Sequence, residues 1–293
     1  MHSDVLLLGV DGGGTKCRAR MTDAKGTVLG EGIAGPANIR FGLEASLAEV
    51  VSAAERCLEQ AGERHGRRRI VACLALAGTG DPVGTAAARA ASHPFFDVIF
   101  TSDARAACVG AHAGQDGGIV IVGTGSIGWA SVGGREHRIG GWGFPISDEG
   151  SGAWLGFQLL RRVLRAHDGM MRWTALLRAT LARFEGNPHH IVRWMGTARP
   201  RDYAALAPLI VEHLLQEDPV ARELTTRAAA HIDAIAAHLT TWGAPRLALM
   251  GGLATHLAPL LNSATQRTLV CPAGDALSGA LRLARVRAEH LAT

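Results

Sequence analysis

An apolar run that stops at an acidic residue and three glycines is the feature that most restricts the fold of this chain. The run Val5–Val10 is long enough for one buried strand, and it ends at Asp11 and Gly12–Gly14. From Cys17 to Thr22 apolar and polar side chains alternate, which is the period of a strand and not of a helix. The segment Val5–Asp23 therefore predicts a β-hairpin with a glycine-rich tip.

The tip of this hairpin has the chemistry of an anion site. Glycine lets backbone N–H groups come close to a bulky anion, and Thr15 and Lys16 add a hydroxyl and a cation at the same place. Asp11, at the end of the buried strand, is placed to hold Mg²⁺ or one of its water ligands. The alternative is an ordinary hairpin whose glycines serve only the turn.

A second hairpin of the same kind favours phosphate binding over an ordinary turn. The segment Gly117–Ile139 repeats the order of strand, glycine–threonine tip, alternating strand, turn and short third strand. At 293 residues the chain is also longer than a typical single domain. Together these observations predict two domains, each built around one hairpin.

Composition excludes several classes of protein. With 47% apolar and 19% charged residues, the chain can build a normal core. The net charge of +4 is scattered and forms no basic tract interleaved with aromatic residues, so no nucleic-acid partner is expected. The five cysteines lack C-x-x-C or Cys/His spacing, which is typical of reduced thiols. No segment reaches the ~18 apolar residues of a membrane span, so we expect a cytoplasmic protein without a membrane partner.

The first half of the chain alternates strands with helices. The strands Ile70–Ala77 and Phe96–Thr101 are each followed by a helical pattern, which indicates an α/β sheet with ligands at the carboxyl ends of its strands. Asp103 follows the second of these strands and begins the helical stretch 104–113. It is a candidate helix N-cap and a candidate general base, and the two roles are compatible.

Two common nucleotide motifs are excluded. Gly123–Gly128 matches G-x-G-x-x-G after a strand, but no helix of ten residues fits behind it, so the dinucleotide fingerprint fails. The pattern G-x-x-x-x-G-K-[ST] is absent because Thr15 separates Gly14 from Lys16. A nucleoside triphosphate site in this chain is therefore not of the Walker type.

Two further glycine-rich segments are candidate ligand sites. The loop Gly140–Gly152 carries Trp142, Asp148 and Glu149 among glycines, which suits a polar ligand with an apolar face, such as a sugar. It could instead be a connector that ends in a helix cap. Gly251–Gly252 separates a strand from a helix and leaves room for a flat ligand such as an adenosine.

The motifs, taken in order, resemble the BadF/BadG-type ATPase family within the actin, hexokinase and heat-shock ATPase superfamily. Within it the chain is most similar to bacterial kinases of glucosamine and N-acetylglucosamine, and the resemblance covers nearly the whole chain. The motifs that carry it are DGGGT (11–15), SDARAACVGAH (102–112), GTGS (123–126), GGWGFPISDEGSG (140–152), MGG (250–252) and GDALSGA (274–280).

The resemblance implies an α/β protein of two ribonuclease-H-like domains with a duplicated phosphate hairpin and a central cleft. The expected domains are residues 1–113 and residues 114–278, the second with a helical insertion, and the helix 279–293 is expected to pack on the first. The implied reaction is ATP plus D-glucosamine giving ADP and D-glucosamine 6-phosphate, with Mg²⁺ and with Asp103 as the base. Whether the chain forms a homodimer stays open.

The resemblance also implies roles for individual residues, although it does not settle the role of Lys16. The residues implied to contact ATP or its metal ion are Asp11, Gly13, Gly14, Thr15, Lys16, Thr124, Gly125, Gly251 and Gly252. The residues implied to contact the sugar are Asn38, Asp103, Ser126, Gly141, Trp142, Gly143 and Asp148.

Two alternatives stay open at this point. The first is an N-acetylglucosamine kinase, since an acetyl group changes only the rim of the sugar pocket. The second is an activator of acyl-CoA dehydratases, a different class in the same family, which holds an iron–sulfur cluster with cysteines. Such a cluster needs well-placed thiols, whereas the cysteines of this chain fall mostly within expected strands and helices.

Overall fold

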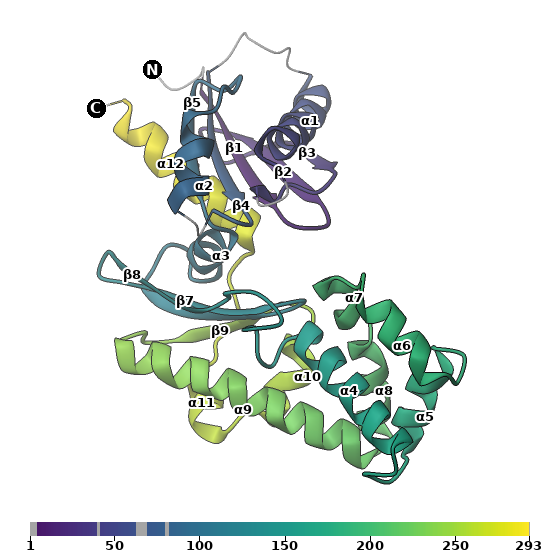
Figure 1. Cartoon of the computed structure of the whole chain (residues 1–293). Helices are drawn as coiled ribbons and strands as arrows, with labels where there is room; N and C mark the ends of the chain where they lie inside the picture. Colours follow the sequence, from purple (N-terminus) through teal and green to yellow (C-terminus); the bar gives the residue numbers. More distant parts are fainter. Residues whose placement is uncertain (1–4, 40–41, 63–68, 80–81, 293) are drawn as a thin grey trace. The chain divides into compact units, whose positions relative to one another are not determined.

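The chain forms two compact units, each with its own β-sheet. The computed structural model describes residues 5–39, 42–62, 69–79 and 82–292. One unit comprises Met1–Gly117 together with Cys271–Thr293, and the other comprises Gly118–Val270. Figure 1 shows the elements of both units.

The sheet of the first unit has five strands in the order β3-β2-β1-β4-β5. β1 pairs antiparallel with β2 and parallel with β4, and β4 pairs parallel with β5. The carboxyl ends of β1, β4 and β5 therefore lie at one edge. The strands are β1 (Val5–Gly12), β2 (Cys17–Asp23), β3 (Val28–Ala34), β4 (Arg69–Leu76) and β5 (Asp97–Thr101). The helices are α1 (Leu43–Ala61), α2 (Pro82–Ala90), α3 (Asp103–Ala111) and α12 (Ala276–His290).

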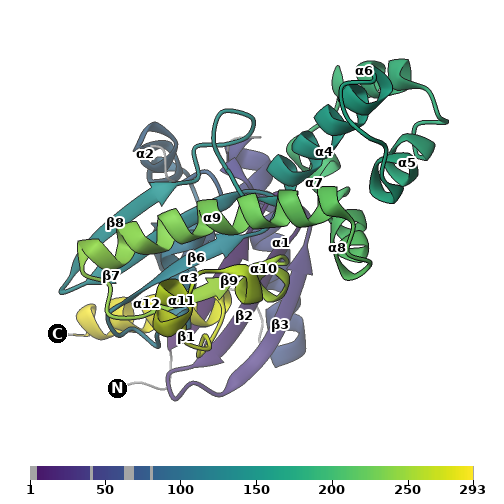
Figure 2. The same ribbon diagram turned by 90° about the horizontal axis from the view of Figure 1, so that it is seen from below.

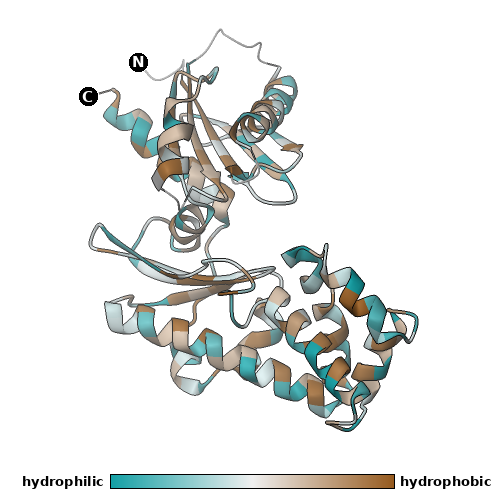
Figure 3. Ribbon diagram, viewed as in Figure 1, coloured by the Kyte–Doolittle hydropathy of each residue, from teal (hydrophilic) through white to brown (hydrophobic). Residues whose placement is uncertain are grey.

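β1 is buried on both faces of this sheet. Leu6, Leu8 and Val10 belong to a core that includes side chains of α1, whereas Leu7 belongs to a second core with side chains of α3 and α12. A strand covered on both faces is apolar at nearly every position, which explains the run Val5–Val10. Figure 3 shows this concentration of apolar residues in the central strands.

The C-terminal helix α12 packs closely on the first unit. A Cβ added to Gly9 of β1 would lie 2.7 Å from Leu281 Cγ, and one added to Gly279 would collide with the carbonyl oxygen of Ala106 in α3. Glycine at both positions therefore lets α12 approach the strand and the neighbouring helix. The expected end of this helix, Thr293, lies outside the described residues.

The second compact unit ends at Val270, whereas the second domain was expected to extend to residue 278. The segment 271–278 belongs to the first unit because it makes specific contacts there. The backbone N–H of Ala273 donates to the carbonyl of Ala111 (2.8 Å), and Asp275 forms an ion pair with Arg18.

The second unit repeats the strand order of the first. Its sheet has the order β8-β7-β6-β9, and β6 pairs parallel with β9 as β1 does with β4. The prediction of a duplicated hairpin in an α/β fold is thus confirmed. The strands are β6 (Gly117–Val122), β7 (Ser126–Val132), β8 (Arg135–Gly140) and β9 (Leu247–Met250).

Helices supply most of the second unit. The long helix α9 lies against β7 and β8 (Figure 2). The other helices pack around α4 and α9, with their apolar side chains in one core. The helices are α4 (Gly152–His167), α5 (Ala175–Ala182), α6 (Pro188–Met195), α7 (Pro200–Ala204), α8 (Ala207–Leu215), α9 (Pro219–Trp242), α10 (Ala254–Leu257) and α11 (Ser263–Thr268), with a 3-10 turn at Ala258–Leu260.

Local signals set most element ends, with one clear difference. α1 stops where the sequence places Gly62, which adopts a left-handed conformation with φ of 70°. The turn Ala24–Gly26 predicts a short third strand over Thr27–Gly30. In the structure β3 continues to Ala34, because it pairs with β2 as far as Cys17. Within the described ranges no helix has the length and apolarity that crossing a bilayer requires.

Candidate active site

The first hairpin tip presents glycines that the fold itself does not require. The N–H of Gly13 donates to the carbonyl of Lys16 (3.0 Å) and closes the turn, and Thr15 and Lys16 are exposed. Gly12 is needed for packing, since a Cβ there would lie 2.5 Å from Leu76 Cδ2.

Gly13 and Gly14 have no such reason to be glycine. Neither has a positive φ, and a Cβ on Gly14 would meet no described atom within 4 Å. A tip without side chains and without an internal need for glycine fits close approach by a ligand to the backbone.

Asp11, at the end of β1, is held by an arginine that sequence reasoning missed. Asp11 and Arg18 are register partners in the hairpin, and the Arg18 guanidinium donates to Asp11 Oδ2 (2.7 Å). The same guanidinium lies 3.2 Å from Asp275 Oδ2 at the start of α12. The hydrogen bond to Asp11 is the main cause that raises the pKa of Arg18 above its usual value.

Asp275 anchors this network to the C-terminal helix. It is the N-cap of α12, and its Oδ1 accepts from the N–H (3.0 Å) and the hydroxyl (2.9 Å) of Ser278. Burial of the carboxyl opposes ionisation, but the bonds from Ser278 and the charge of Arg18 outweigh it, so the pKa of Asp275 lies below its usual value. The orientation of Asp11 therefore depends on a contact between the two ends of the chain.

Asp103 lies at the same carboxyl edge as the hairpin tip, because it follows β5 directly. Of the two candidate roles of Asp103, that of helix N-cap belongs to the preceding residue. Ser102 is the N-cap, and its hydroxyl accepts from the N–H of Arg105 (3.1 Å). Asp103 is the first helical residue, and its Oδ1 accepts from the N–H of Ala104 (2.8 Å). The carboxylate therefore stabilises the first turn of α3 without being its N-cap.

Asn38 also lies at this edge. It forms a parallel bridge with Ala77, the residue after β4, and the N–H of Ala77 donates to Gly12 (2.8 Å). The hydroxyl of the nearby Thr79 donates to the carbonyl of Thr101 at the end of β5 (2.8 Å). The structure thus brings Asp11, Asn38 and Asp103 to one edge of the first sheet.

The second hairpin tip is joined to the start of α4. The N–H of Gly123 donates to Gly125 (2.9 Å), and the N–H groups of Gly152 and Ala153 donate to Gly123 (2.8 Å) and Thr124 (3.1 Å). The Thr124 side chain itself is exposed. The Thr124 hydroxyl is therefore accessible at the tip, while the backbone of the tip is hydrogen-bonded to the first residues of α4.

Asp148 lies beside this tip. A Cβ on Gly125 would be 2.6 Å from Asp148 Oδ2, so glycine makes room for the carboxylate. The other oxygen, Oδ1, accepts from the N–H of Gly143 (3.3 Å) across the glycine-rich loop. Burial raises the pKa of Asp148 above its usual value, against the opposing effect of N–H bonds from Gly143 and Phe144.

The glycine-rich loop presents an aromatic side chain on its surface. Trp142 is 72% exposed, and the guanidinium of Arg138 lies 4.3 Å from the centre of its ring. Arg138 also donates to the carbonyls of Gly140 (3.1 Å) and Gly141 (2.5 Å), so it fixes the loop that carries the indole. The sequence did not indicate Arg138, because its partners are backbone carbonyls at the end of β8 and a backbone partner leaves no pattern of residue types.

Ser126 was predicted to contact the sugar, but in the structure it is buried and bonded within the protein. Its side chain is 3% exposed, and its hydroxyl donates to the carbonyl of Glu149 (2.8 Å). This bond ties β7 to the loop that carries Asp148. Gly141 and Gly143 have φ of 68° and 109°, so the loop conformation explains why both are glycine.

Gly251 and Gly252 follow β9, next to the end of β6. The N–H of Leu253 donates to the carbonyl of Val122 (3.1 Å). Gly251 has φ of 98°, and a Cβ there would collide with the backbone of Val122. Gly252 has neither constraint, since no described atom lies within 4 Å of the position of its Cβ. Gly251 is therefore required by the fold, and Gly252 is the better candidate for a ligand contact.

Two α/β units with one strand order, each with a hairpin tip at the edge of its sheet, define the two-domain actin-like class of ATP-binding proteins. The family follows from the sequence. The model of the BadF/BadG/BcrA/BcrD ATPase family matches residues 8–284, and the chain belongs to this family.

Individual relatives agree with this family. The chain is 40% identical over 284 residues to a glucosamine kinase of Vibrio cholerae, covering 97% of this chain and 96% of the relative. It is 31% identical over 175 residues to an N-acetylmuramic acid/N-acetylglucosamine kinase of Clostridium acetobutylicum, covering 55% and 54%. A crystal structure of a candidate N-acetylglucosamine kinase of Chromobacterium violaceum, 35% identical, superposes with a TM-score of 0.89 over 96% of this chain and 99% of that one.

The two glycines after β9 allow a direct test of which glycine the fold requires and which one is available for a ligand contact. Gly251→Ala is expected to lower the free energy of unfolding by about 2 kcal/mol or more, because alanine is strained at positive φ and collides with β6. Gly252→Ala is expected to change it by less than about 1 kcal/mol, in either direction. Urea denaturation of both variants measures the difference, and equal losses of stability would contradict the assignment.

Proposed function

We propose that the chain is an ATP-dependent hexosamine kinase that phosphorylates the 6-hydroxyl of D-glucosamine. The observation that carries this proposal is the pair of glycine-containing hairpin tips with exposed residues, accompanied by Asp11 and Asp103 at one edge of the first sheet. Phosphoryl transfer needs charge neutralised on the phosphates and an acceptor held in line, so catalysis is mostly positioning and electrostatics. We assign the reaction to the cytoplasm, because its co-substrate ATP is available there.

The first tip and the second tip are assigned to the phosphates of ATP. The backbone N–H group of Gly14 and the hydroxyls of Thr15 and Thr124 can donate to phosphate oxygens, and Lys16 adds a positive charge. Gly13, whose own N–H closes the turn, lets the phosphates come close to the backbone. Gly252 and its neighbour Gly251 are assigned to the adenosine side. For Gly13, Gly14 and Gly252 these proposals rest on the absence of a packing reason for glycine, whereas Gly251 is required by the fold and is included only as the neighbour of Gly252.

The residues present fit a magnesium ion that takes most of its ligands from phosphate and water. No described residue donates to Asp11 Oδ1, while Oδ2 is held by Arg18. The described part of the chain contains no group of three or more His, Cys, Asp or Glu side chains arranged for a metal. One carboxylate with substrate phosphates is a usual way to bind Mg²⁺. When bound, the ion would neutralise charge on the β- and γ-phosphates.

Asp103 is assigned as the base that accepts the proton of the sugar 6-hydroxyl. Asp103 follows β5 at the same edge of the first sheet as Asn38, which is assigned to a sugar hydroxyl. Trp142, Asp148, Gly141 and Gly143 are assigned to the sugar from the second unit. Ser126 is reassigned to the support of this loop, because its hydroxyl is already used internally.

The preference for glucosamine rests on carboxylates near the glycine-rich loop. Asp148 and the exposed Glu149 favour an ammonium group, whereas an acetamide needs a slot for its methyl and a donor for its carbonyl. The relative from Vibrio cholerae is a glucosamine kinase. N-Acetylglucosamine is the second candidate, because the exposed ring of Trp142 could pack on a methyl group.

The dehydratase-activator alternative does not fit the cysteines. Four of the five are buried, and burial raises the pKa of Cys17 and Cys73 to about 12. Thiolates that hold an iron–sulfur cluster between subunits must be accessible and deprotonated. Only Cys271 among the five is exposed.

The role of Asp103 predicts a large loss of turnover in one variant. Asp103→Asn is expected to keep the fold and sugar binding but to lower kcat by about 10²- to 10⁴-fold, the usual range for a positioned base. The matched control is Asp97→Asn, since Asp97 begins β5 whereas Asp103 follows its end, and Asp97 pairs with Arg287. A kcat for Asp103→Asn within a few-fold of the Asp97→Asn value would remove Asp103 from this role.

Arg18 is proposed as a positioning residue for Asp11. Arg18→Met is expected to weaken the affinity for MgATP by about 10-fold or more, because residues that orient a metal ligand typically contribute 10- to 100-fold to metal affinity. The KM for the sugar should stay nearly unchanged, and Arg18→Lys should restore part of the affinity. Steady-state kinetics with varied MgATP and varied sugar separate the two constants. A rise in the sugar KM alone would contradict the positioning of Asp11 by Arg18.

A further inference from the structure

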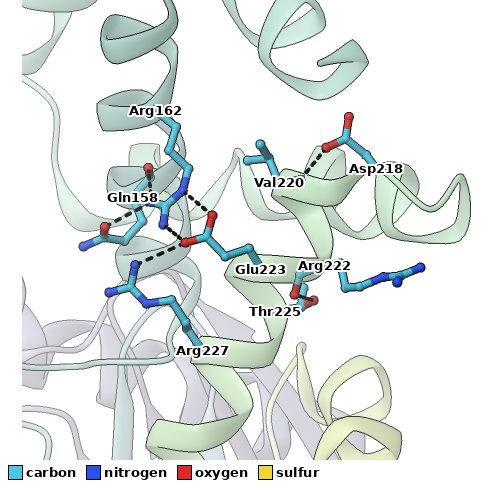
Figure 4. Close-up of polar contacts among 8 residues, drawn as sticks. All are labelled: Gln158, Arg162, Asp218, Val220, Arg222, Glu223, Thr225 and Arg227. Atoms are coloured by element: carbon cyan, nitrogen blue, oxygen red, sulfur yellow. Dashed lines mark hydrogen bonds and ion pairs between the residues drawn. The ribbon is translucent and has the colours of Figure 1, made fainter. Parts of the chain in front are cut away.

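A second cluster of charged residues lies between helices α4 and α9, and none of its residues is assigned to the kinase reaction. Arg162 of α4 donates to Glu223 of α9 through both Nη2 (2.5 Å to Oε1) and Nε (3.3 Å to Oε2). Its Nη1 donates to the carbonyl of Gln158 (3.0 Å). Figure 4 shows these side chains converging from the two helices, with Arg227 beside them. The buried Arg162 thus joins the two helices.

A cavity of about 380 Å³ opens beside this ion pair. Because Arg161, Arg165 and Arg227 are exposed, solvent reaches it. Four guanidinium groups and one carboxylate face the cavity, so its lining carries a net charge of +3 (+4 from arginine, −1 from glutamate). The polar lining residues are Gln158, Arg161, Arg162, Arg165, Glu223 and Arg227.

Glu223 cannot neutralise the positive charge of the arginines that line the cavity. Both of its oxygens already accept from Arg162, and Oε1 also lies 3.7 Å from Arg227. The hydrogen bond from Arg162 is the main cause that lowers the pKa of Glu223, so the single carboxylate is fully ionised near neutral pH. Arg165 has no ion pair or hydrogen bond with any described side chain. Positive charge therefore accumulates around a hollow of ligand size.

Helix electrostatics explains only part of the cluster. Arg165 lies in the last turn of α4, where a cation stabilises the helix dipole. This reason does not apply to Arg227, which comes from α9, or to Arg162, which is committed to Glu223. Arg227 and Arg161 also stack on the rings of Trp154 and Phe157, at 5.4 and 5.7 Å from the ring centres, but these contacts do not neutralise the positive charge around the cavity.

We propose that this cavity binds a small anion with at least two negative charges, and that the anion is a phosphate monoester. Guanidinium groups match phosphate oxygens in pairs, which makes arginine the preferred residue for such recognition. The cavity is larger than a phosphate group alone needs, so it accommodates an organic part as well. No described residue accepts from the Gln158 Nε2 group, which is therefore placed to donate to a hydroxyl of that part. The proposal does not depend on the kinase assignment, because none of these residues takes part in it.

Thermal unfolding with defined probes tests the site. D-Glucose 6-phosphate represents phosphate monoesters, citrate represents carboxylates, and D-glucose is the uncharged control. The variant carries Arg165→Gln together with Arg227→Gln, which leaves the Arg162–Glu223 pair intact. The matched control is Arg222→Gln, since Arg222 is on the same helix but points away from the cluster (Figure 4) and pairs with Glu217. Any binding elsewhere in the molecule is common to the three proteins.

D-Glucose 6-phosphate is expected to raise the melting temperature of the wild type and of Arg222→Gln. In the double variant the concentration for half of this effect should rise by at least about tenfold, because each charge-assisted hydrogen bond lost weakens binding severalfold. D-Glucose should have no differential effect. Added salt should weaken the effect of the phosphate monoester.

Three outcomes would overturn the proposal. An equal shift in all three proteins would place the binding elsewhere, and the absence of a shift at millimolar probe would exclude the site. Citrate acting as well as D-glucose 6-phosphate, in the wild type but not in the double variant, would make the ligand a carboxylate. A changed sedimentation coefficient of the double variant without any differential shift would identify the arginines as a contact between copies of the chain.

Discussion

The burial of β1 on both of its faces is the constraint on which the first unit depends. Helix α1 covers one face, and α3 and α12 cover the other, so the strand cannot shift without exposing two cores. The strand ends at Asp11, and the glycine tip follows at once. Because α12 comes from the end of the chain, the position of Asp11 depends on both termini. Arg18 and Asp275 add a polar contact to this packing at the edge of the sheet.

The two hairpins share a strand order but differ in chemistry. In the first, an acid precedes the tip and is held by an arginine of the next strand. In the second, Val122 precedes Gly123, no carboxylate occupies that position, and the tip is held by N–H groups at the start of α4. The two copies of the hairpin are therefore proposed to have different roles. The metal ion is assigned to the first copy. In the second copy a threonine hydroxyl is assigned to phosphate, and the first residues of α4 support the tip.

The order of elements could be predicted from the sequence because glycines interrupt apolar runs of clear period. The strand–tip–strand pattern around Asp11 and its repeat at Thr124 predicted a duplicated hairpin and the candidate phosphate residues, the alternation of strands with helices predicted the α/β class, and the family resemblance implied two ribonuclease-H-like domains. The N-cap of α3 was misplaced because Ser102 and Asp103 are adjacent and both are favoured caps. The strand β3 was too short in the prediction because its last residues alternate with glycines.

What could not be predicted depends on contacts between distant residues. Nothing in the pattern around Arg18 indicates that its partner is Asp275, and the alternation assigned Arg18 only to a face of its strand. Arg162 and Glu223 are similarly far apart in the chain and meet only when α4 and α9 pack. Ser126 has the residue type of a ligand contact, and only its burial assigns its hydroxyl to Glu149.

The most direct test of the central claim is to follow the products of ATP, Mg²⁺ and D-glucosamine by ³¹P NMR, with N-acetyl-D-glucosamine in a parallel reaction. The account predicts ADP and a sugar phosphate in equal amounts, with the phosphate on the 6-hydroxyl and a higher kcat/KM for D-glucosamine. A higher kcat/KM for N-acetyl-D-glucosamine would change the substrate and keep the reaction. Release of ADP without phosphate on either sugar would contradict the account.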